Sequence, residues 1–290
     1  MNNLELFSRI KNLPLVSSRL VDGFLAGNYR SVFKGPGLEF DEVREYSESD
    51  DSRFIDWNVS SRLNAPYTKT FREEREIVLF LIVDVSASLR TGTGKVRKKD
   101  AAAILSSLLA FSAVHNNDRV GAVFFTDRIE KWVPPRKGKK QVFRLVEDMM
   151  DLKPEGKGSD LGHAIKTVYE SLHRRGICVV ISDFRVPPVW RELVLLGKKH
   201  DVIALKITDP SDFDFPVSGL IELTDPETGA TIYGSGRFNK FRREYREFWE
   251  TNDIFWRREC LRRGVHTLSV STEDDPVKEL LGFFSSRRNR

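Results

Sequence analysis

The sequence is poor in sulfur and has no long hydrophobic run. Its 290 residues include two cysteines, Cys178 and Cys260, and neither belongs to a CxxC pair. Both are therefore expected to be buried thiols in a reducing compartment, not part of a disulfide or a zinc site. The longest apolar run, residues 77–83, is far shorter than the ~20 residues that a membrane-spanning helix needs. Since the N-terminal segment also lacks the apolar core of a signal peptide, we expect a cytoplasmic protein with no membrane span.

The sequence also lacks the short motifs that mark common enzyme classes. It contains no GxSxG nucleophile elbow, no HExxH zinc motif and no GxxxxGK(S/T) phosphate-binding loop. Of its scattered histidines, His163 lies near a candidate site, in the segment GSDLGHAI. It could act as a base or a ligand, although a histidine on a helix packed against a sheet is more often an interior or boundary residue. No catalytic residue is assigned, and we do not expect an enzyme.

Charge of one sign is not in large excess. The chain has 47 basic and 42 acidic residues, a net charge of +5. Nucleic-acid binding is one interpretation of this surplus, but glutamates are interleaved with the arginines, which favours a solvated helix face. No nucleic-acid partner is expected.

Between residues 77 and 208, apolar runs alternate with amphipathic stretches. The runs predict strands over 77–84, 119–126, 129–135, 177–183 and 201–208, and the stretches predict helices over 95–117, 141–152, 161–176 and 186–200. Pro134 and Pro135 are expected to end the third strand, and Gly176 to cap the third helix. This alternation is typical of a doubly wound α/β fold, in which helices cover both faces of a mostly parallel sheet.

The pattern changes after Pro210. The sequence predicts a hairpin over 220–234, a long charged helix over 238–263, a strand over 264–272 and a closing helix that starts at Asp275 and Pro276. These elements complete a domain over residues 77–290.

Residues 1–76 do not follow the alternation and are interpreted as an N-terminal arm. Residues 13–33 could hold short helices. Residues 34–76 predict an extended, ordered segment, because their aromatic side chains argue against disorder. Alternating basic and acidic residues favour an ion-pair network that pins the arm against the following domain. In the alternative, Asp56, Trp57 and Arg62 form a docking surface for another protein.

Polar side chains follow the buried strands where a doubly wound sheet brings loops together. Asp84, Ser86 and Ser88 come directly after the first strand, in the string DVSAS. Ser159 precedes a helix, and Asp183 ends the strand ICVVISD. The carboxyl ends of parallel strands meet at one edge of the sheet, and carboxylate and hydroxyl oxygens are the ligands that hard divalent cations prefer. The five residues predict a site for Mg²⁺, with Mn²⁺ and Ca²⁺ as alternatives.

Each of these residues also has an ordinary structural interpretation. Ser86 and Ser88 could cap the segment that follows them, and Ser159 could be the N-cap of the next helix. Asp84 and Asp183 could hold loops by accepting backbone N–H bonds. The order of all five on this alternating framework favours a metal.

The DVSAS string resembles the von Willebrand factor A family, a Rossmann-type fold whose metal-ion-dependent adhesion site uses DxSxS, a threonine and an aspartate. Asp84, Ser86 and Ser88 match the first element and Asp183 matches the last. Ser159 stands where the family usually has threonine, a change that keeps the hydroxyl. In members that use this site for adhesion, a carboxylate of the partner completes the coordination of the metal.

The N-terminal arm resembles a more specific family. The segment GLEFDEVREYSESDDSRFIDWNVSSRLNAPYTKTFREERE, residues 37–76, resembles the signature of the bacterial family called domain of unknown function 58. Members are often encoded beside a MoxR-type AAA+ ATPase, which the resemblance implies as a partner. We therefore expect a non-enzymatic, metal-dependent protein-binding module, an adaptor or co-chaperone for such an ATPase and its client. The alternative is a Mg²⁺-dependent hydrolase that uses the same oxygen ligands.

Overall fold

The computed structural model describes residues 38–47, 50–73, 77–217, 219–227 and 229–288, and the short helices predicted over 13–33 lie outside them. The described residues divide into two compact units: those between 38 and 73 belong to the smaller unit, and those from 77 to 288 belong to the larger one. Each unit is described by itself.

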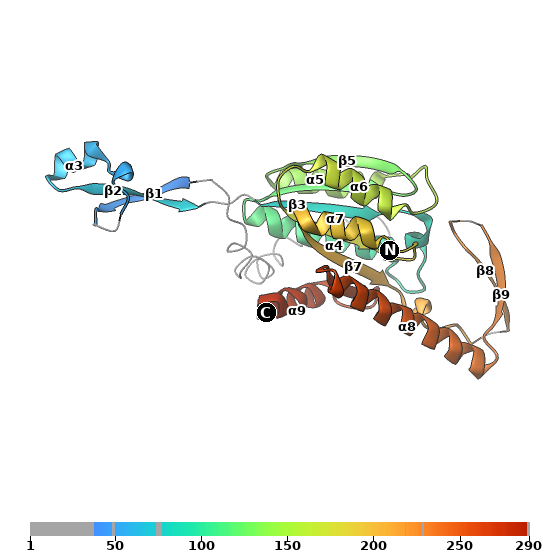
Figure 1. The fold of residues 1–290 in the computed structure, drawn as a ribbon. Coiled ribbons are helices and arrows are strands. Elements are labelled where there is room, and N and C mark those ends of the chain that lie inside the picture. Colours follow the sequence, from blue (N-terminus) through green and yellow to red (C-terminus); the bar gives the residue numbers. More distant parts are fainter. Residues whose placement is uncertain (1–37, 48–49, 74–76, 218, 228, 289–290) are drawn as a thin grey trace. The chain divides into compact units, whose positions relative to one another are not determined.

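The larger unit is built on a six-stranded sheet with the order β10-β7-β6-β3-β4-β5 (Figure 1). Its strands are β3 (Val78–Asp84), β4 (Arg119–Phe125), β5 (Ile129–Arg136), β6 (Ile177–Ser182), β7 (Asp201–Thr208) and β10 (His266–Ser271). Neighbouring strands are parallel except for β4 and β5, which are antiparallel. The prediction of an α/β protein with a mostly parallel sheet is confirmed.

Helices cover both faces of this sheet (Figure 1). They are α4 (Lys98–His115), α5 (Lys139–Asp151), α6 (Leu161–Ser171), α7 (Trp190–Lys199), α8 (Asn239–Arg262) and α9 (Pro276–Arg288). Helices α6, α7 and α8 pack on the face that carries Phe80 and Ile82 of β3. Helix α4 lies against β3, β4, β6 and β7 and contacts α5 and α9. It is buried on nearly all sides, which suits its sequence of alanine, serine and leucine without a charged face.

Strand β5 corrects one prediction. It runs through Pro134 and Pro135 and ends at Arg136, so the prediction that the prolines end it is wrong. An edge strand tolerates proline because it does not need every N–H for the ladder. The register with β4 shifts opposite the prolines, and the side chain of Gln141 donates to the Pro134 carbonyl at 2.9 Å.

Helix α6 corrects a second prediction. It ends at Ser171 with Leu172 as its C-cap, so Gly176 does not cap it. Instead, Gly176 allows close packing, because a Cβ atom there would lie 2.3 Å from the carbonyl oxygen of Val78.

The C-terminal elements match their predictions. Strands β8 (Leu220–Thr224) and β9 (Thr231–Ser235) form an antiparallel hairpin. On α8, Arg257 pairs with Asp253 at 2.8 Å and Arg263 with Glu259 at 2.6 Å, as expected for interleaved charges on one helix. None of the described helices is both long and apolar enough to span a membrane.

Both cysteines are buried and free, as predicted. Burial raises the pKa of the Cys260 thiol to about 12 and also raises the pKa of Cys178. Such thiols stay protonated at neutral pH and are inert as nucleophiles.

The smaller unit is not the extended segment that we predicted. Strands β1 (Leu38–Glu45) and β2 (Tyr67–Glu73) pair antiparallel, and the chain between them forms η1 (Ser52–Phe54) and α3 (Trp57–Leu63). Ion pairs join residues within this unit, with Arg44 2.6 Å from Asp50 and Lys69 3.2 Å from Asp56. These pairs stabilise the local fold of the unit.

Candidate functional site

The candidate metal residues lie at the switch point of the sheet. Strands β3 and β6 are neighbours, and the chain leaves them in opposite directions, from β3 to β4 and from β6 to β7. Asp84 is the last residue of β3, Ser182 is the last residue of β6, and Asp183 follows it. Because ligands bind in the crevice at such a point, the topology alone makes this edge the candidate site.

Asp84 is the centre of the cluster. Its carboxylate is 1% exposed. One oxygen accepts the backbone N–H of Ser86 at 2.9 Å, and the other accepts the hydroxyls of Ser159 at 2.9 Å and Ser182 at 2.8 Å. Burial and the charge of Asp183 raise the pKa of Asp84, while these hydrogen bonds oppose the shift. The ends of β3 and β6 and the loop after α5 therefore meet on one carboxylate.

Ser86 and Ser88 complete the first loop. Their hydroxyl oxygens are 3.0 Å apart, and both residues are buried. Ser86 precedes the short helix η2 (Ala87–Arg90), but its side chain makes no capping hydrogen bond to it. The loop is held by two backbone bonds, from Val85 to Phe125 at 2.9 Å and from Ala87 to Lys157 at 3.1 Å. The hydroxyl pair is thus fixed next to Asp84 without serving the helix.

Ser159 is not a helix cap either. The N-cap of α6 is Asp160, whose side chain accepts the N–H of His163 at 2.9 Å. The Ser159 hydroxyl points instead to Asp84. The interpretation of Ser159 as the N-cap is wrong.

Asp183 is held by a buried cation that the sequence analysis did not single out. One oxygen of its carboxylate accepts the N–H of Arg185 at 3.3 Å, and the other lies 3.3 Å from Nζ of Lys98. Lys98 is 1% exposed and also donates to Asp212 at 2.8 Å. A lysine at the start of a helix looks solvated in the sequence, so no pattern marks it as buried. With Asp183 paired to Lys98, Asp84 is the carboxylate of the cluster with no lysine or arginine bonded to it in the described structure.

The donor set fits a hard divalent cation. Two carboxylates and several hydroxyls lie at the edge of β3 and β6, and oxygen ligands of this kind suit Mg²⁺, Ca²⁺ or Mn²⁺. In the described part of the chain, no group of three His, Cys, Asp or Glu side chains is placed to hold an ion. A cation here would therefore depend on the serine hydroxyls and on water as well as on Asp84.

A further polar side chain comes from a distant part of the chain. The carboxylate of Glu227, in the loop between β8 and β9, interacts with the hydroxyls of Ser88 and Ser86. Burial raises the pKa of Glu227, and the charges of Asp84 and Asp183 add to the rise. The sequence analysis treated this residue as part of a turn, because nothing in a turn sequence shows where its tip packs.

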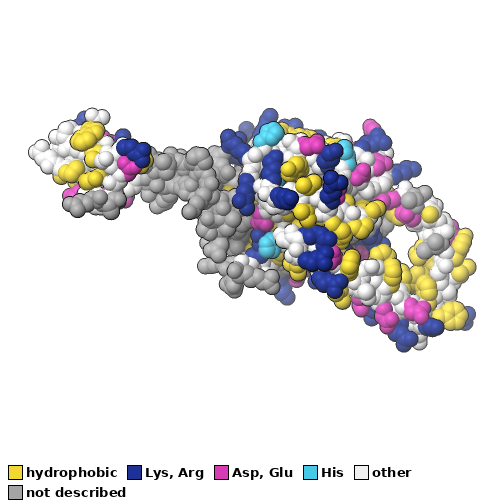
Figure 2. Space-filling model, in the orientation of Figure 1, with side chains coloured by type: hydrophobic (Ala, Val, Ile, Leu, Met, Phe, Trp, Pro, Cys, Tyr) yellow, Lys and Arg dark blue, Asp and Glu magenta, His cyan; other side chains and the backbone are white. Residues whose placement is uncertain are grey.

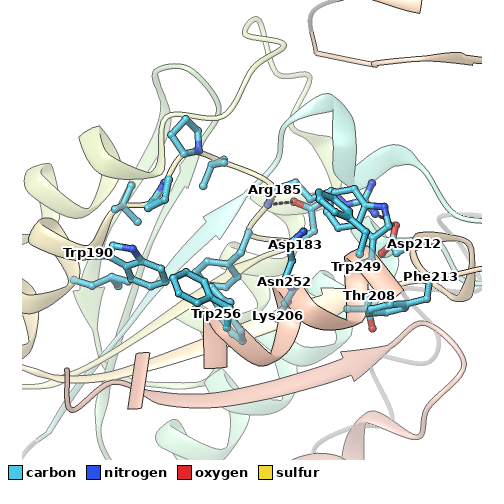
Figure 3. Close-up of a pocket in the computed structure, with 18 residues that line it drawn as sticks. Asp183, Arg185, Trp190, Lys206, Thr208, Asp212, Phe213, Trp249, Asn252 and Trp256 are labelled. Atoms are coloured by element: carbon cyan, nitrogen blue, oxygen red, sulfur yellow. Dashed lines mark hydrogen bonds and ion pairs between the residues drawn. The ribbon is translucent and has the colours of Figure 1, made fainter. Parts of the chain in front are cut away.

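Two cavities adjoin the cluster. One has a volume of about 340 Å³ and is lined by Asp84 and Ser86 together with residues of α4 and of the end of α5. The other, of about 400 Å³, includes Asp183 in its wall (Figure 3). Both are large enough to admit side chains of a partner.

Aromatic side chains form a large part of the wall of the larger cavity (Figure 3). The guanidinium of Arg185 lies 4.4 Å from the ring centre of Trp249 and 2.9 Å from Asp212. Phe184 has a left-handed backbone with φ of 52°, an unfavourable conformation for a bulky residue, and its ring packs 4.8 Å from that of Trp256. The strained residue directly follows Asp183, and it turns the chain from the cluster into the cavity wall.

Hydrophobic side chains also gather on the surface over α8 and the β8–β9 hairpin (Figure 2). The exposed ones are Val217, Leu220, Tyr233, Phe238, Phe241, Phe248, Ile254, Phe255 and Leu261. An exposed apolar surface of this kind is typical of a protein-interaction site.

The remaining predicted residues are less central. His163 is exposed on α6, not interior as expected. In the smaller unit, Asp56 is the N-cap of α3 and accepts the N–H groups of Asn58 and Val59, so its main role is structural. Trp57 is 72% exposed, and Arg62 is exposed too.

The fold and the cluster define the class. This is an α/β protein with a mostly parallel sheet, and it carries a carboxylate–hydroxyl cluster at its switch point. The chain belongs to the family described as Protein of unknown function DUF58, whose model matches residues 42–253.

Curated relatives agree with this assignment. The Uncharacterized protein Mb1516 of Mycobacterium bovis and the Uncharacterized protein Rv1480 of Mycobacterium tuberculosis are each 30% identical over 297 residues, covering 98% of this chain and 90% of theirs. The chain is also similar to the crystal structure of the conserved hypothetical protein BatB from Bacteroides thetaiotaomicron. That likeness has a TM-score of 0.48 at 16% identity and covers 74% of this chain and 100% of that one.

Proposed function

We propose that this protein is a metal-dependent protein-binding module of the von Willebrand factor A type. It binds a divalent cation, preferably Mg²⁺, through Asp84, Ser86, Ser88, Ser159 and Asp183, and it captures a partner through that ion without catalysing a reaction. The partner we propose is a MoxR-type AAA+ ATPase with its client, in the bacterial cytoplasm.

One observation carries the proposal. A single buried carboxylate, Asp84, accepts the hydroxyl of Ser159, in the loop after α5, and that of Ser182, the last residue of β6. Side chains far apart in sequence thus meet on one buried carboxylate, whereas a local structural cap would need only nearby backbone N–H groups. The oxygen-only donor set supports a hard cation.

The chemistry of capture follows from charge. A divalent cation at this site would supply an electrophilic anchor for a carboxylate of the partner. The residues of the chain would hold this cation: Asp84 would provide negative charge, and the serines would provide neutral oxygen ligands. The aromatic wall beside Asp183 gives a partner an apolar contact close to that anchor.

The choice of an ATPase partner rests on the family and not on a contact in the structure. The arm carries the family signature, and members are often encoded beside such ATPases. The smaller unit shows an exposed Trp57, a residue type enriched where proteins bind one another.

The test compares the wild type with Asp84→Asn and Ser86→Ala. Titration calorimetry with Mg²⁺ should give saturable binding to the wild type and at least about a tenfold weaker binding to either variant, because each loses a ligand. The control is Asp160→Asn, an exposed carboxylate beside Ser159 whose replacement keeps a good N-cap. Equal Mg²⁺ binding by the wild type and Asp84→Asn would refute the metal site.

The partner is tested with the purified MoxR-type ATPase of the same organism. Binding should require Mg²⁺, disappear with a chelator and be lost in Asp84→Asn. Binding that depends neither on Mg²⁺ nor on Asp84 would refute capture through the metal. Mg²⁺-dependent turnover of a phosphoester that Asp84→Asn abolishes would instead support the hydrolase alternative.

A further inference from the structure

The larger cavity has a polar floor. It lies between α8 and the loop that follows β6, and its volume of about 400 Å³ falls in the range of roughly 300–1,000 Å³ that is usual for ligand sites (Figure 3). Lys206 and Thr208 of β7 line it. They lie on the same face of the strand as Val202 and Ala204, which belong to the core beneath α6, α7 and α8. The polar floor thus begins where the apolar core of this face ends.

A largely buried ion pair crosses this floor. Nζ of Lys206 lies 2.9 Å from the carboxylate of Asp253 on α8, and the two side chains are 15% and 11% exposed. Asp253 also pairs with Arg257 at 2.8 Å. Two cations therefore share one carboxylate, which leaves one positive charge in this group uncompensated.

The ion pairs on the opposite wall are balanced. Arg185 lies 2.9 Å from Asp212, and Lys98 lies 2.8 Å from Asp212 and 3.3 Å from Asp183. Two cations here face two carboxylates. Together with the floor, the ion pairs around the cavity carry one positive charge in excess, so a ligand with a single negative charge is complementary to them.

Each of the three tryptophans that line the cavity already has a cation over its ring. The pairs are Arg185 over Trp249 at 4.4 Å, Lys206 over Trp256 at 5.0 Å and Arg263 over Trp190 at 4.9 Å. A cationic ligand would have to compete with these groups for the same rings and would be repelled by them. The aromatic wall therefore suits an aromatic body with no positive charge.

The rim of the cavity is exposed and apolar. Phe248 and Phe255 of α8 line the cavity but are 60% and 45% exposed. They continue into the hydrophobic side chains that gather over α8 and the β8–β9 hairpin (Figure 2). A small acid inside the cavity would leave this rim in water, whereas a segment of a partner protein can fill the cavity and cover the rim together. The rim therefore favours a protein segment over a small molecule.

We infer that this cavity binds a segment of a partner protein through an aromatic side chain that has a carboxylate next to it. The ring packs against the tryptophans of the wall, and the carboxylate accepts hydrogen bonds from Lys206 and Arg185. The side-chain amide of Asn252 also lines the cavity and adds a neutral donor (Figure 3). No metal ion takes part, so the inference goes beyond the proposed metal site and is tested separately.

The first experiment compares small probes that share an indole ring and differ in charge. N-acetyltryptophan is an anion, N-acetyltryptophanamide is neutral and tryptamine is a cation. Ligand-detected NMR titrations of the full chain, in chelator, should give the tightest binding for the anion. Its dissociation constant should be at least about tenfold lower than that of the neutral probe, as expected for charge-assisted hydrogen bonds. The cation should bind most weakly.

Lys206→Met tests the contact with the carboxylate. The substitution removes the ammonium group but keeps the length of the side chain, and Asp253 retains Arg257 as its cation. The variant should therefore fold and should lose the preference for the anion over the neutral probe. Lys199→Met is the matched control, because Lys199 also lies over an aromatic ring, 5.1 Å from that of Tyr169, but does not line the cavity. It should keep the preference of the wild type.

Phe248→Ala tests the apolar contact at the rim. It should weaken binding of the anion and of the neutral probe by the same factor, because both bury the same ring. The control is Phe238→Ala, since Phe238 is 66% exposed and lies outside the cavity lining. This variant should bind both probes like the wild type.

A capped peptide distinguishes a protein segment from a small acid. It carries leucines followed by an adjacent glutamate and tryptophan, so that it can cover the rim as well as fill the cavity. It should bind at least about tenfold more tightly than N-acetyltryptophan, because it buries more apolar surface. Replacement of its glutamate by glutamine should weaken binding about tenfold through loss of the charged hydrogen bonds.

The outcomes decide each part of the inference. If the three small probes bind equally, or if Lys206→Met keeps the preference for the anion, the contact with the carboxylate is refuted. A peptide that binds no more tightly than N-acetyltryptophan refutes the protein segment and assigns the cavity to a small acid. If no probe binds, the whole inference is refuted. All measurements are made in chelator, so failure of the proposed metal site would leave them unchanged.

Discussion

The buried ammonium group of Lys98 donates to the carboxylate of Asp183 at 3.3 Å. Asp212 shares the same cation at 2.8 Å but keeps a second ion pair with Arg185 at 2.9 Å. Lys98 is therefore the group that compensates the charge of Asp183 at the edge of the candidate site.

Lys98→Met should destabilise the protein strongly. The substitution keeps the length of the side chain but leaves Asp183 as a buried charge without its cation, which costs roughly 3–5 kcal/mol in comparable cases. Urea unfolding in chelator measures the change. Lys166→Met is the control, because Lys166 and Glu170 form an exposed pair at 4.0 Å whose loss costs at most about 1 kcal/mol. Equal small losses in the two variants would contradict a structural role for Lys98.

Two glycines should respond to alanine with opposite signs. Gly176→Ala places a Cβ atom 2.3 Å from the Val78 carbonyl oxygen and should lower the free energy of unfolding by roughly 1–3 kcal/mol through overpacking. Gly197 lies within α7, and a Cβ atom there meets nothing within 4 Å. Gly197→Ala should stabilise by up to about 1 kcal/mol through helix propensity. Thermal unfolding of both variants measures the signs, and a neutral Gly176→Ala would show that β3 and β6 can separate at no cost.

Stability should fall on acidification because of His200. The side chain is 2% exposed, and its Nδ1 accepts the N–H of Gly176 at 3.3 Å. Burial lowers the pKa of His200 to about 4 from 6.5, and the charges of Lys199 and Arg175 act in the same direction. Between these values the unfolded chain binds a proton that the folded chain does not. The contribution is therefore complete above pH 6.5 and is lost as the pH falls towards 4.

The size of this effect is at most about 3 kcal/mol, at 1.36 kcal/mol per pKa unit. Urea unfolding of the wild type and of His200→Gln is measured at about six pH values between 7.5 and 4.5. The difference between the two proteins isolates the contribution of His200, because all other groups titrate in both. The two profiles should converge as the pH falls. Parallel profiles would mean that His200 is protonated in the folded protein.

In the smaller unit, Asp56 and Trp57 should separate stability from binding. Asp56→Ala removes the N-cap of α3 and its ion pair with Lys69 and should cost about 1 kcal/mol, visible as faster amide exchange in residues 57–63. Trp57→Ala removes a side chain that is 72% exposed and should leave that exchange unchanged while weakening ATPase binding. Slower or unchanged exchange in Asp56→Ala would contradict the capping role.

Much of the sheet is predictable because its strands are buried on both faces. The run that forms β3 is continuously apolar up to Asp84 and the run that forms β7 is mostly apolar, and both strands match their predicted ranges within one residue. The meeting of Asp84 with Ser159 follows from the same pattern, since the topology of an alternating chain brings those loops to one edge.

The sequence could not show contacts made by ordinary-looking residues. Lys98, Ser182 and Glu227 belong to types that usually lie on the surface, and only tertiary packing turns them inwards. The predicted end of α6 was wrong for a related reason. Gly176 looks like a helix cap in the sequence, but in the structure it allows close packing against Val78. Propensity reflects the local sequence, whereas the roles of these residues depend on contacts with residues far away in sequence.

The prolines of β5 limit how copies of this protein can associate. At the edge of the sheet, Pro134 has no N–H to offer, and its carbonyl oxygen already accepts a bond from Gln141. An incoming strand would therefore find neither a donor nor a free acceptor at this residue, and edge-to-edge stacking of sheets is disfavoured. The proposed capture of partners through the loops would thereby be kept separate from association of copies through the sheet edge.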